Sequence, residues 1–158
     1  MKPVLCLTAA LLLAGCAHDG AKPEATPAAP RVKPAGMFEI MSTPEVASFF
    51  AANSVALYQG KPQLRQFNLV HNYGKPEQIG AGKTYVRSSS ALRVINCERD
   101  ETAQFGRVYF TDYFASGEEI ARRDETPQWE PLQRQSILGE LRNLVCAIDA
   151  KRLRAAGH

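Results

Sequence analysis

The chain of 158 residues has little of what marks a metalloprotein, a nucleotide-binding enzyme or a nucleic-acid-binding protein. Its three histidines form no metal-ligand cluster with cysteines or carboxylates. The segment Gly80-Ala81-Gly82-Lys83 does not have the spacing of a phosphate-binding loop. A formal net charge of +3 is too small to predict nucleic-acid binding, which usually requires a concentrated basic face. The sequence therefore predicts no metal, no cofactor and no nucleic-acid partner.

The apolar segment 4–13, which follows a single lysine, is too short to cross a bilayer. It runs into Leu13-Ala14-Gly15-Cys16, and small residues before a cysteine in this position are typical of a bacterial lipoprotein signal. We expect residues 1–15 to be removed and Cys16 to carry acyl chains such as palmitate. The alternatives are an ordinary secretory peptide with a cysteine near its cleavage site, or an uncleaved anchor.

Ala17, not aspartate, follows Cys16, and in this the chain resembles lipoproteins that are sorted to the outer membrane. Several acyl chains on one terminus give stable anchoring, because each buried methylene contributes roughly 0.8 kcal/mol. The sequence thus predicts an outer-membrane protein whose membrane contact is its covalent lipid. It leaves open whether the domain faces the cell surface or the periplasm.

Residues 16–36 contain several prolines among alanines and charges, and hardly any residue that could build a core. The prolines are Pro23, Pro27, Pro30 and Pro34. This composition predicts a semi-extended, disordered tether that holds the folded part away from the bilayer. The remaining residues, 37–158, have the size of one domain with one core.

Two cysteines remain in the folded part, Cys97 and Cys146, because Cys6 lies in the signal and Cys16 is the expected lipidation site. An even pair in an exported, oxidising context favours a disulfide. In the chain-entropy model, closing a loop of this length stabilises a fold by roughly 4 kcal/mol. A redox dithiol and a metal site are the alternatives, although neither cysteine has a cysteine or histidine at ligand spacing.

Short runs rich in aromatic and β-branched residues, separated by turn-forming residues, predict strands over most of the domain. The predicted strands are 38–41, 46–50, 55–58, 63–73, 84–97 and 102–114. Turns are expected at 59–62 and 98–101, where Gly, Pro or Asp occurs. This spacing indicates hairpins of an antiparallel sheet with about six strands.

A helix is expected after the strands, with Ser136 as its N-cap and an end near Arg154. Its apolar stripe consists of Ile137, Leu141, Leu144, Val145 and Ile148. The sheet is the available partner for this stripe, so the sequence predicts an α+β domain with the helix packed on the sheet. Because Cys146 lies in the helix and Cys97 at the end of a strand, their disulfide would join the two elements.

Several motifs occur in a fixed order along the domain. They are Lys83-Thr84-Tyr85-Val86-Arg87-Ser88-Ser89-Ser90, Arg93-Val94-Ile95-Asn96-Cys97, Val108-Tyr109-Phe110-Thr111-Asp112-Tyr113, Gly117, Trp129, Ser136 and Val145-Cys146. Together with the lipoprotein signal, this order resembles the surface-adhesin protein E family over most of residues 37–150. The most specific part is the strand 85–97 combined with the distant Cys146.

The resemblance implies a lipid-anchored domain with a curved antiparallel sheet and a C-terminal helix tied across it by a disulfide. The namesake of the family is an outer-membrane adhesin, without enzymatic activity, that engages host extracellular-matrix and serum proteins. Lys83 falls where the namesake has a basic recognition segment, and Thr84 follows it here in place of a second basic residue.

Basic residues also form a loose series around the two long predicted strands. The series consists of Lys75, Lys83, Arg87, Arg93, Arg99 and Arg107. If several share one exposed face, they can attract an acidic partner segment, a phosphate of lipopolysaccharide or another polyanion. If they alternate between faces, they are ordinary solubilising charges, which also discourage aggregation of an exposed sheet edge. Lys83, Arg87 and Arg93 are the candidate partner-binding residues.

Catalytic candidates are few. Ser88, Ser89 and Ser90 supply hydroxyls, but a catalytic triad also needs a positioned base, and His71 is the only histidine of the predicted core. His71 alternates with apolar residues along a predicted strand, which favours a structural, buried or half-buried histidine. Trp129 is expected either to anchor an interface or to pack against the start of the helix. The sequence therefore predicts that the protein is not an enzyme.

Two functions remain. The first is an adhesin-like binding module for a host or extracellular protein, which requires surface display and an exposed basic face that includes Lys83 and Arg87. The second is a periplasm-facing lipoprotein with a structural or envelope-assembly role and no host ligand. Exposed edge strands also permit a homodimer, which the sequence does not decide.

Overall fold

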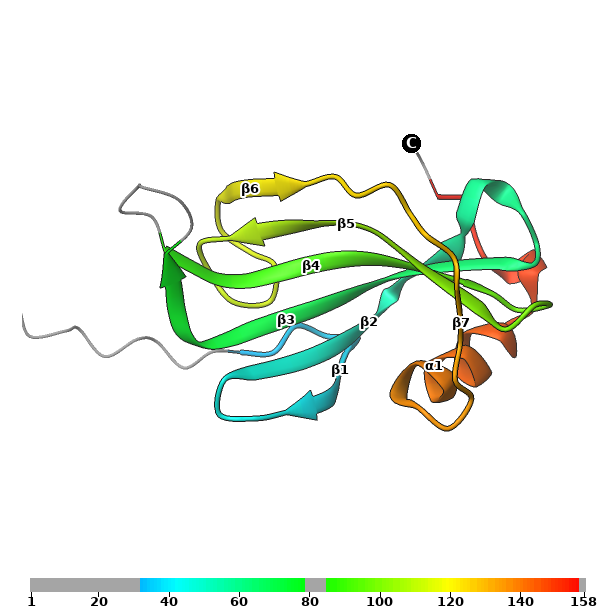
Figure 1. Ribbon diagram of the computed structural model, residues 1–158, viewed down its shortest axis with the longest axis horizontal. Helices are drawn as coiled ribbons and strands as arrows, with labels where there is room; N and C mark the ends of the chain where they lie inside the picture. The colour runs from blue at the N-terminus through cyan, green and yellow to red at the C-terminus, as the bar shows by residue number, and fades with distance from the viewer. Residues whose placement is uncertain (1–31, 79–84, 157–158) are drawn as a thin grey trace, which may run out of the picture. The chain divides into compact units, whose positions relative to one another are not determined.

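The computed structural model describes residues 32–78 and 85–156, in which six strands follow one another across an antiparallel sheet (Figure 1). The strands are β1 (Met37–Ser42), β2 (Val46–Leu57), β3 (Leu64–Gln78), β4 (Tyr85–Asn96), β5 (Glu101–Phe110) and β6 (Glu119–Arg123). A seventh, two-residue strand, β7 (Glu130–Pro131), pairs with the start of β5. A short 3-10 helix, η1 (Tyr58–Gly60), joins β2 to β3. The predicted class, an antiparallel sheet followed by one helix, is confirmed.

Strand β2 is a single element, so the prediction of two strands at 46–50 and 55–58 was wrong. Its pairing with β3 shifts register between Ala51 and Ala56. Ser54 bridges this irregularity, because its hydroxyl donates to the carbonyl of Ala51 at 2.6 Å and accepts from the amide of Asn68 at 2.8 Å. The side chain replaces a missing ladder bond, and the strand therefore continues through a segment that reads as a turn.

The predicted strand 102–114 is too long, since β5 ends at Phe110. Phe114 and Ala115 have positive φ angles of 59° and 54°, which extended strands exclude. The chain reverses there, with the amide of Thr111 donating to the carbonyl of Glu118, and returns as β6. Neither β6 nor β7 was expected from the sequence.

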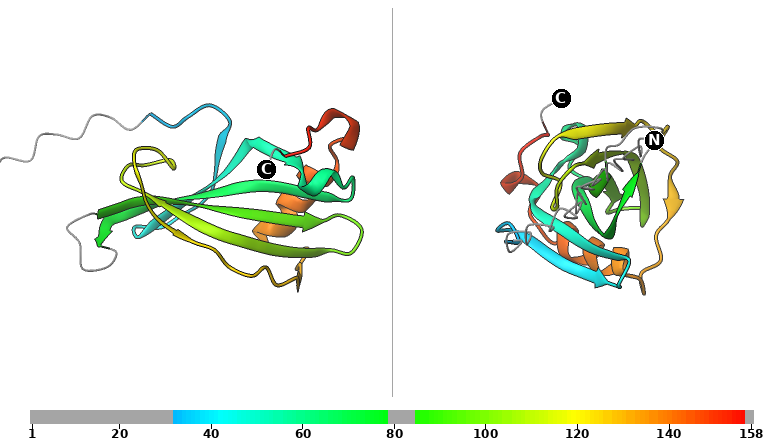
Figure 2. Two further views of the ribbon diagram at one scale, coloured as in Figure 1. Left: turned by 90° about the horizontal axis from the view of Figure 1, so that it is seen from above. Right: turned by 90° about the vertical axis from the view of Figure 1, so that its left-hand side faces the viewer.

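Because side chains alternate along a strand, the sheet has two distinct faces. Phe50, Phe67, Leu69 and Ile95 lie on one of them and form the core with residues of the helix. This side is called the helix face below, and the other side the opposite face. Figure 2 shows the helix against the strands near one end of the sheet. Beyond that end, α1 does not cover the helix face (Figure 2).

Helix α1 (Ile137–Cys146) begins as predicted, with the hydroxyl of Ser136 accepting a hydrogen bond from the amide of Gly139 at 3.1 Å. It ends at Cys146 and not near Arg154. The carboxylate of Asp149 accepts from the amide of Lys151 at 3.0 Å and so starts a separate 3-10 turn, η2 (Ala150–Arg152). Aspartate competes in this way with continuation of a helix.

Only part of the predicted apolar stripe of the helix is covered. Leu141 and Val145 are buried and complete the core, together with Leu132. Ile137 and Leu144 keep 45% and 55% of their surface exposed. The helix therefore rests on the sheet along a narrow seam, which makes additional attachments important for its position.

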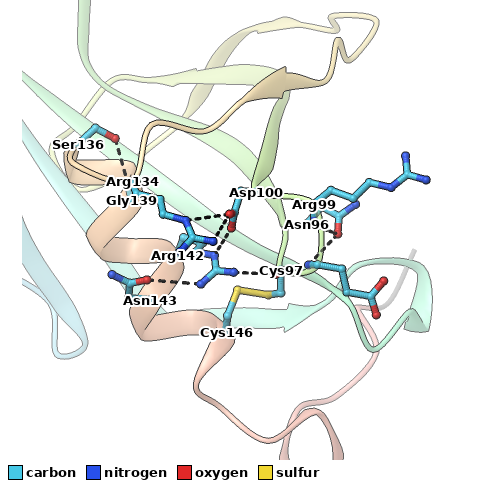
Figure 3. A network of polar contacts seen from close by, with 11 residues as sticks. Asn96, Cys97, Arg99, Asp100, Arg134, Ser136, Gly139, Arg142, Asn143 and Cys146 are labelled. Carbon is cyan, nitrogen blue, oxygen red and sulfur yellow. Dashed lines mark hydrogen bonds and ion pairs between the residues drawn. A yellow bond between two sulfur atoms is a disulfide. The ribbon is translucent and has the colours of Figure 1, made fainter.

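The predicted disulfide is present and joins Cys97, the residue that follows β4, to the last residue of α1 (Figure 3). The Cα atoms of Cys97 and Cys146 are 5.7 Å apart, within the ordinary range for a disulfide. Beside it, Asp100 in the β4–β5 turn binds the guanidinium groups of Arg134 and Arg142, and Arg142 also donates to the carbonyl of Cys97 at 2.8 Å. We call these five residues the helix clamp.

The predicted signal and most of the tether, including Cys16, lie outside the described residues. Residues 32–35 of the tether are exposed and lead into β1. Within 32–78 and 85–156, the structure contains no helix with the length and apolar character that a membrane crossing requires.

Candidate interaction surface

Four arginines of β4, β5 and β6 lie on the helix face. Arg87 and Arg93 have the same parity on β4 as Ala91, which places all three on this face. Arg107 of β5 is directly opposite Ala91, and Arg123 of β6 is directly opposite Arg107. We call Arg87, Arg93, Arg107 and Arg123 the arginine face.

The sequence left open whether the basic residues share one face of the sheet or alternate between its faces. Three members of the basic series share one face. Arg87, Arg93 and Arg107 lie on one side of the sheet, whereas Arg99 is exposed in the β4–β5 turn and Lys75 near the end of β3. Lys83 lies outside the described residues. The sequence did not identify Arg123 as part of this face. Because β6 was not predicted as a strand, Arg123 could not be assigned to either face of the sheet.

Arg93 is held by contacts within the domain. Its side chain is only 16% exposed, with one guanidinium nitrogen 3.4 Å from a carboxylate oxygen of Glu130 and another donating to the side-chain oxygen of Gln104. Burial lowers its pKa, and Glu130 partly restores it. Of the predicted partner-binding residues, Arg93 is thus already engaged within the domain.

Arg87 lies near the free end of the β3–β4 hairpin. Its guanidinium carbon is 5.8 Å from the ring centroid of Tyr113, which is 5% exposed. A cation held over a buried ring keeps a defined position while remaining half accessible. Tyr85, two residues before it on β4, is 53% exposed. This end of the hairpin presents an arginine and an aromatic ring to solvent.

Arg107 and Arg123 form the centre of the arginine face. Arg107 donates to the hydroxyl of Ser89 at 3.0 Å, and Arg123 lies over the ring of Tyr109 at 5.6 Å. Among the described side chains, no carboxylate is within ion-pair distance of either guanidinium. Two adjacent, uncompensated positive charges are therefore held side by side.

His71 extends this face on β3, opposite Ser48 and Ser89. Its Nδ1 is 2.8 Å from the hydroxyl of Ser48. Burial lowers the pKa of His71, the charges of Arg107 and Arg93 lower it further, and together they bring it to about 4. The imidazole is half-buried and uncharged at neutral pH, as expected for a structural histidine.

The serine hydroxyls proposed as catalytic candidates are used inside the sheet. Ser88 donates to the carbonyl of Asp112 and Ser89 contacts the hydroxyl of Tyr73 at 2.9 Å, and both serines are fully buried. Ser48, the hydroxyl that contacts His71, is 3% exposed. These contacts account for the hydroxyls of Ser88, Ser89 and Ser48 as parts of the fold, whereas Ser90 lines the groove on the opposite face. In residues 32–78 and 85–156 the structure contains no group of three or more potential metal ligands.

The opposite face has a different character. Tyr58, Phe105 and Trp129 form a row of rings, with centroids 4.8 Å and 6.5 Å apart. Trp129 is 42% exposed and contacts a ring of β5. A shallow groove of about 330 Å³ continues from Phe105 over Leu92, Val108 and Phe110. Its rim includes Glu119 and Arg122, which neutralise each other in an ion pair of 2.8 Å.

Comparisons with known proteins point to one family and one fold. The family model described as surface-adhesin protein E matches residues 38–147. A solved structure of protein E from non-typeable Haemophilus influenzae has a TM-score of 0.66, with 18% identity over 80% of this chain and 86% of that chain. A selenomethionine form of Haemophilus influenzae protein E has a TM-score of 0.64, with 18% identity over 77% of this chain and 94% of that chain. At this identity the structural likeness shows a shared fold.

Proposed function

Because this chain belongs to the surface-adhesin protein E family, we propose that it is a lipid-anchored outer-membrane module that binds an extracellular protein through its arginine face. The observation that carries this proposal is the alignment of four arginines on one side of the sheet, with two of them uncompensated. An electropositive surface speeds encounter with an acidic partner and fixes its orientation. The family and the fold favour binding over catalysis.

The hairpin end of this face supplies the second contact region. Arg87 is kept in place by the ring of Tyr113, and Tyr85 is exposed nearby. Tyrosine and arginine are enriched among the residues that contribute most to protein interfaces. Lys83, which lies outside the described residues, precedes this strand in the sequence and carries a further positive charge. We therefore include Lys83 and Arg87 in the proposed binding region.

Binding can be tested with purified full-length protein on immobilised matrix and serum proteins. Arg87→Gln and Lys83→Gln should each weaken binding. Arg99→Gln removes a charge of the same sign from an exposed turn outside the arginine face, so it is the matched control and should bind as the parent does. Equal loss in all three variants would indicate a general charge effect and contradict the proposed site.

The alternative is a periplasm-facing lipoprotein with a structural role. The two proposed functions place the domain on different sides of the outer membrane. External protease applied to intact cells distinguishes them, and lysed cells are the control. Loss of the domain from intact cells supports surface display. Protection until lysis would exclude adhesion to a host protein and favour the structural role.

A further inference from the structure

Strand β6 forms one margin of the sheet. It pairs with β5 on one side, and no described strand pairs with its other side (Figure 1). An unpaired edge presents backbone N–H and C=O groups that can accept another extended chain. The side chains along this edge indicate which charge such a chain would carry.

Side chains of β6 differ sharply between the two faces. On the opposite face, Arg122 is neutralised by Glu119, with a second bond from its Nε at 3.0 Å. On the helix face, Arg123 is directly opposite Arg107. Like charges directly opposite each other on neighbouring strands are destabilising. The positive charge of β6 that no carboxylate of the described residues neutralises therefore lies on the helix face, within the arginine face.

The local backbone keeps the two arginines together. Gly106 has a φ angle of +79° and lies where the β4–β5 register shifts, so it forms a bulge just before Arg107. A Cβ at this position would come within 2.6 Å of the carbonyl oxygen of Arg123. The glycine therefore permits the close approach of β6 to β5 that places Arg123 opposite Arg107.

Charged edge residues also protect a sheet from aggregation, and this is the simpler explanation of Arg123. It does not account for the sign of the charge. A glutamate at this position would protect the edge equally and would neutralise Arg107. Among the described residues no carboxylate is within ion-pair distance of Arg107 or Arg123; Glu130 is bonded to Arg93, and Glu125 accepts from Gln104 at 3.2 Å.

We propose that the free edge of β6 receives an extended acidic segment of the partner protein as an added strand, with a carboxylate opposite Arg123 on the helix face. The row Ala91, Arg107, Arg123 would then end in a negative charge. This deepens the proposed function and rests on it, because it specifies the chemistry of the bound segment. A second copy of β6 is disfavoured as the added strand, since it would bring further arginines to the same edge.

The test uses purified full-length protein and a short labelled peptide that alternates glutamate with threonine. Its affinity is measured by fluorescence anisotropy and the position of its contacts by amide chemical shifts. Arg123→Gln should weaken binding by about two- to fivefold, the range of a cross-strand charge pair. Arg122→Gln changes the net charge by the same amount on the opposite face, away from the expected carboxylate, and should weaken binding less than Arg123→Gln does. A peptide with glutamine in place of glutamate should bind more weakly than the parent peptide.

Backbone pairing is tested separately with the same peptide methylated on alternate amides. It should lose binding, and the unmodified peptide should shift amides of 119–123. Equal binding of the methylated peptide, equal loss in both arginine variants, or shifts at β1 would overturn the proposal. So would an Arg123-dependent dimer, or Arg123-dependent binding of heparin in the absence of peptide binding. Failure of the peptide with retained binding to matrix or serum protein would reject this inference and leave the proposed function standing.

Discussion

Arg142 and Asp100 form an ion pair across the junction of α1 and the β4–β5 turn, with 2.7 Å between Nε and Oδ1. The side chains are 19% and 25% exposed, and Arg142 also donates to the carbonyl of Cys97 (Figure 3). Arg142→Gln should therefore lower the free energy of unfolding by about 1–3 kcal/mol, the usual range for hydrogen bonds to charged groups. Urea denaturation measures this change.

Arg99→Gln is the control for this prediction. Arg99 is exposed in the same turn, where its backbone amide, not its side chain, bonds to Asn96 at 3.3 Å. Its replacement should change stability by less than about 0.5 kcal/mol, as is usual for surface positions. Similar effects of both substitutions would mean that the ion pair does not hold the helix.

The disulfide makes the second contribution to this junction. Cys97 and Cys146 are separated by 49 residues in the sequence, so their bond restricts a long loop of the unfolded chain. Cys97→Ser should lower the free energy of unfolding by about 4 kcal/mol and leave Cys146 open to a thiol reagent. A Cys146 that already reacts in the unreduced parent protein would contradict the disulfide in solution.

The disulfide and the start of the helix could be predicted because each depends on few residues. Two cysteines in an exported domain leave one pairing, and Ser136 before an apolar stripe marks an N-cap. The course of β2 could not be predicted, because Ser54 supplies a bond to Asn68 that only the folded sheet brings within reach. Long-range contacts of this kind override the local turn signal.

The candidate site was predictable only in part. The sequence identifies Arg87, Arg93 and Arg107, but a strand's face depends on register, and the bulge at Gly106 changes the register of β5. Arg123 could not be assigned to the site from the sequence. The charged residues of β6 do not have the pattern of a strand and form one through pairing with β5. The two positive charges that matter most for the proposal therefore come together only through tertiary structure.

His71 should make stability depend on pH. Its pKa is about 4 in the folded protein and about 6.5 when unfolded, so the unfolded chain takes up a proton first as pH falls. This contribution to stability is fully present above about pH 6.5 and is lost progressively between about pH 6.5 and 4. For a half-buried ring we expect a loss on the order of 1–2 kcal/mol, measured by urea denaturation across this range.

His71→Asn tests the origin of that dependence. Asparagine can retain a hydrogen bond to Ser48 but does not titrate, so the slope of stability against pH between 6.5 and 4 should become flatter. Asp100 titrates in a lower range, because hydrogen bonding to Arg134 lowers the pKa of its carboxyl below the ordinary value. An unchanged slope in the variant would show that other groups produce the effect.

The predicted anchor gives the last test, because every surface role of the domain requires it. Cys16→Ser removes the sulfur to which acyl chains would be attached and leaves the domain untouched. We expect the variant to leave the membrane fraction and appear in the soluble envelope fraction, with an unchanged melting temperature. Cys97→Ser is the matched cysteine control: it should destabilise the domain while the protein stays in the membrane fraction. If the Cys16 variant instead remains membrane-bound until detergent is added, the chain is held by the apolar segment 4–13 or by a partner, and the lipid anchor is wrong.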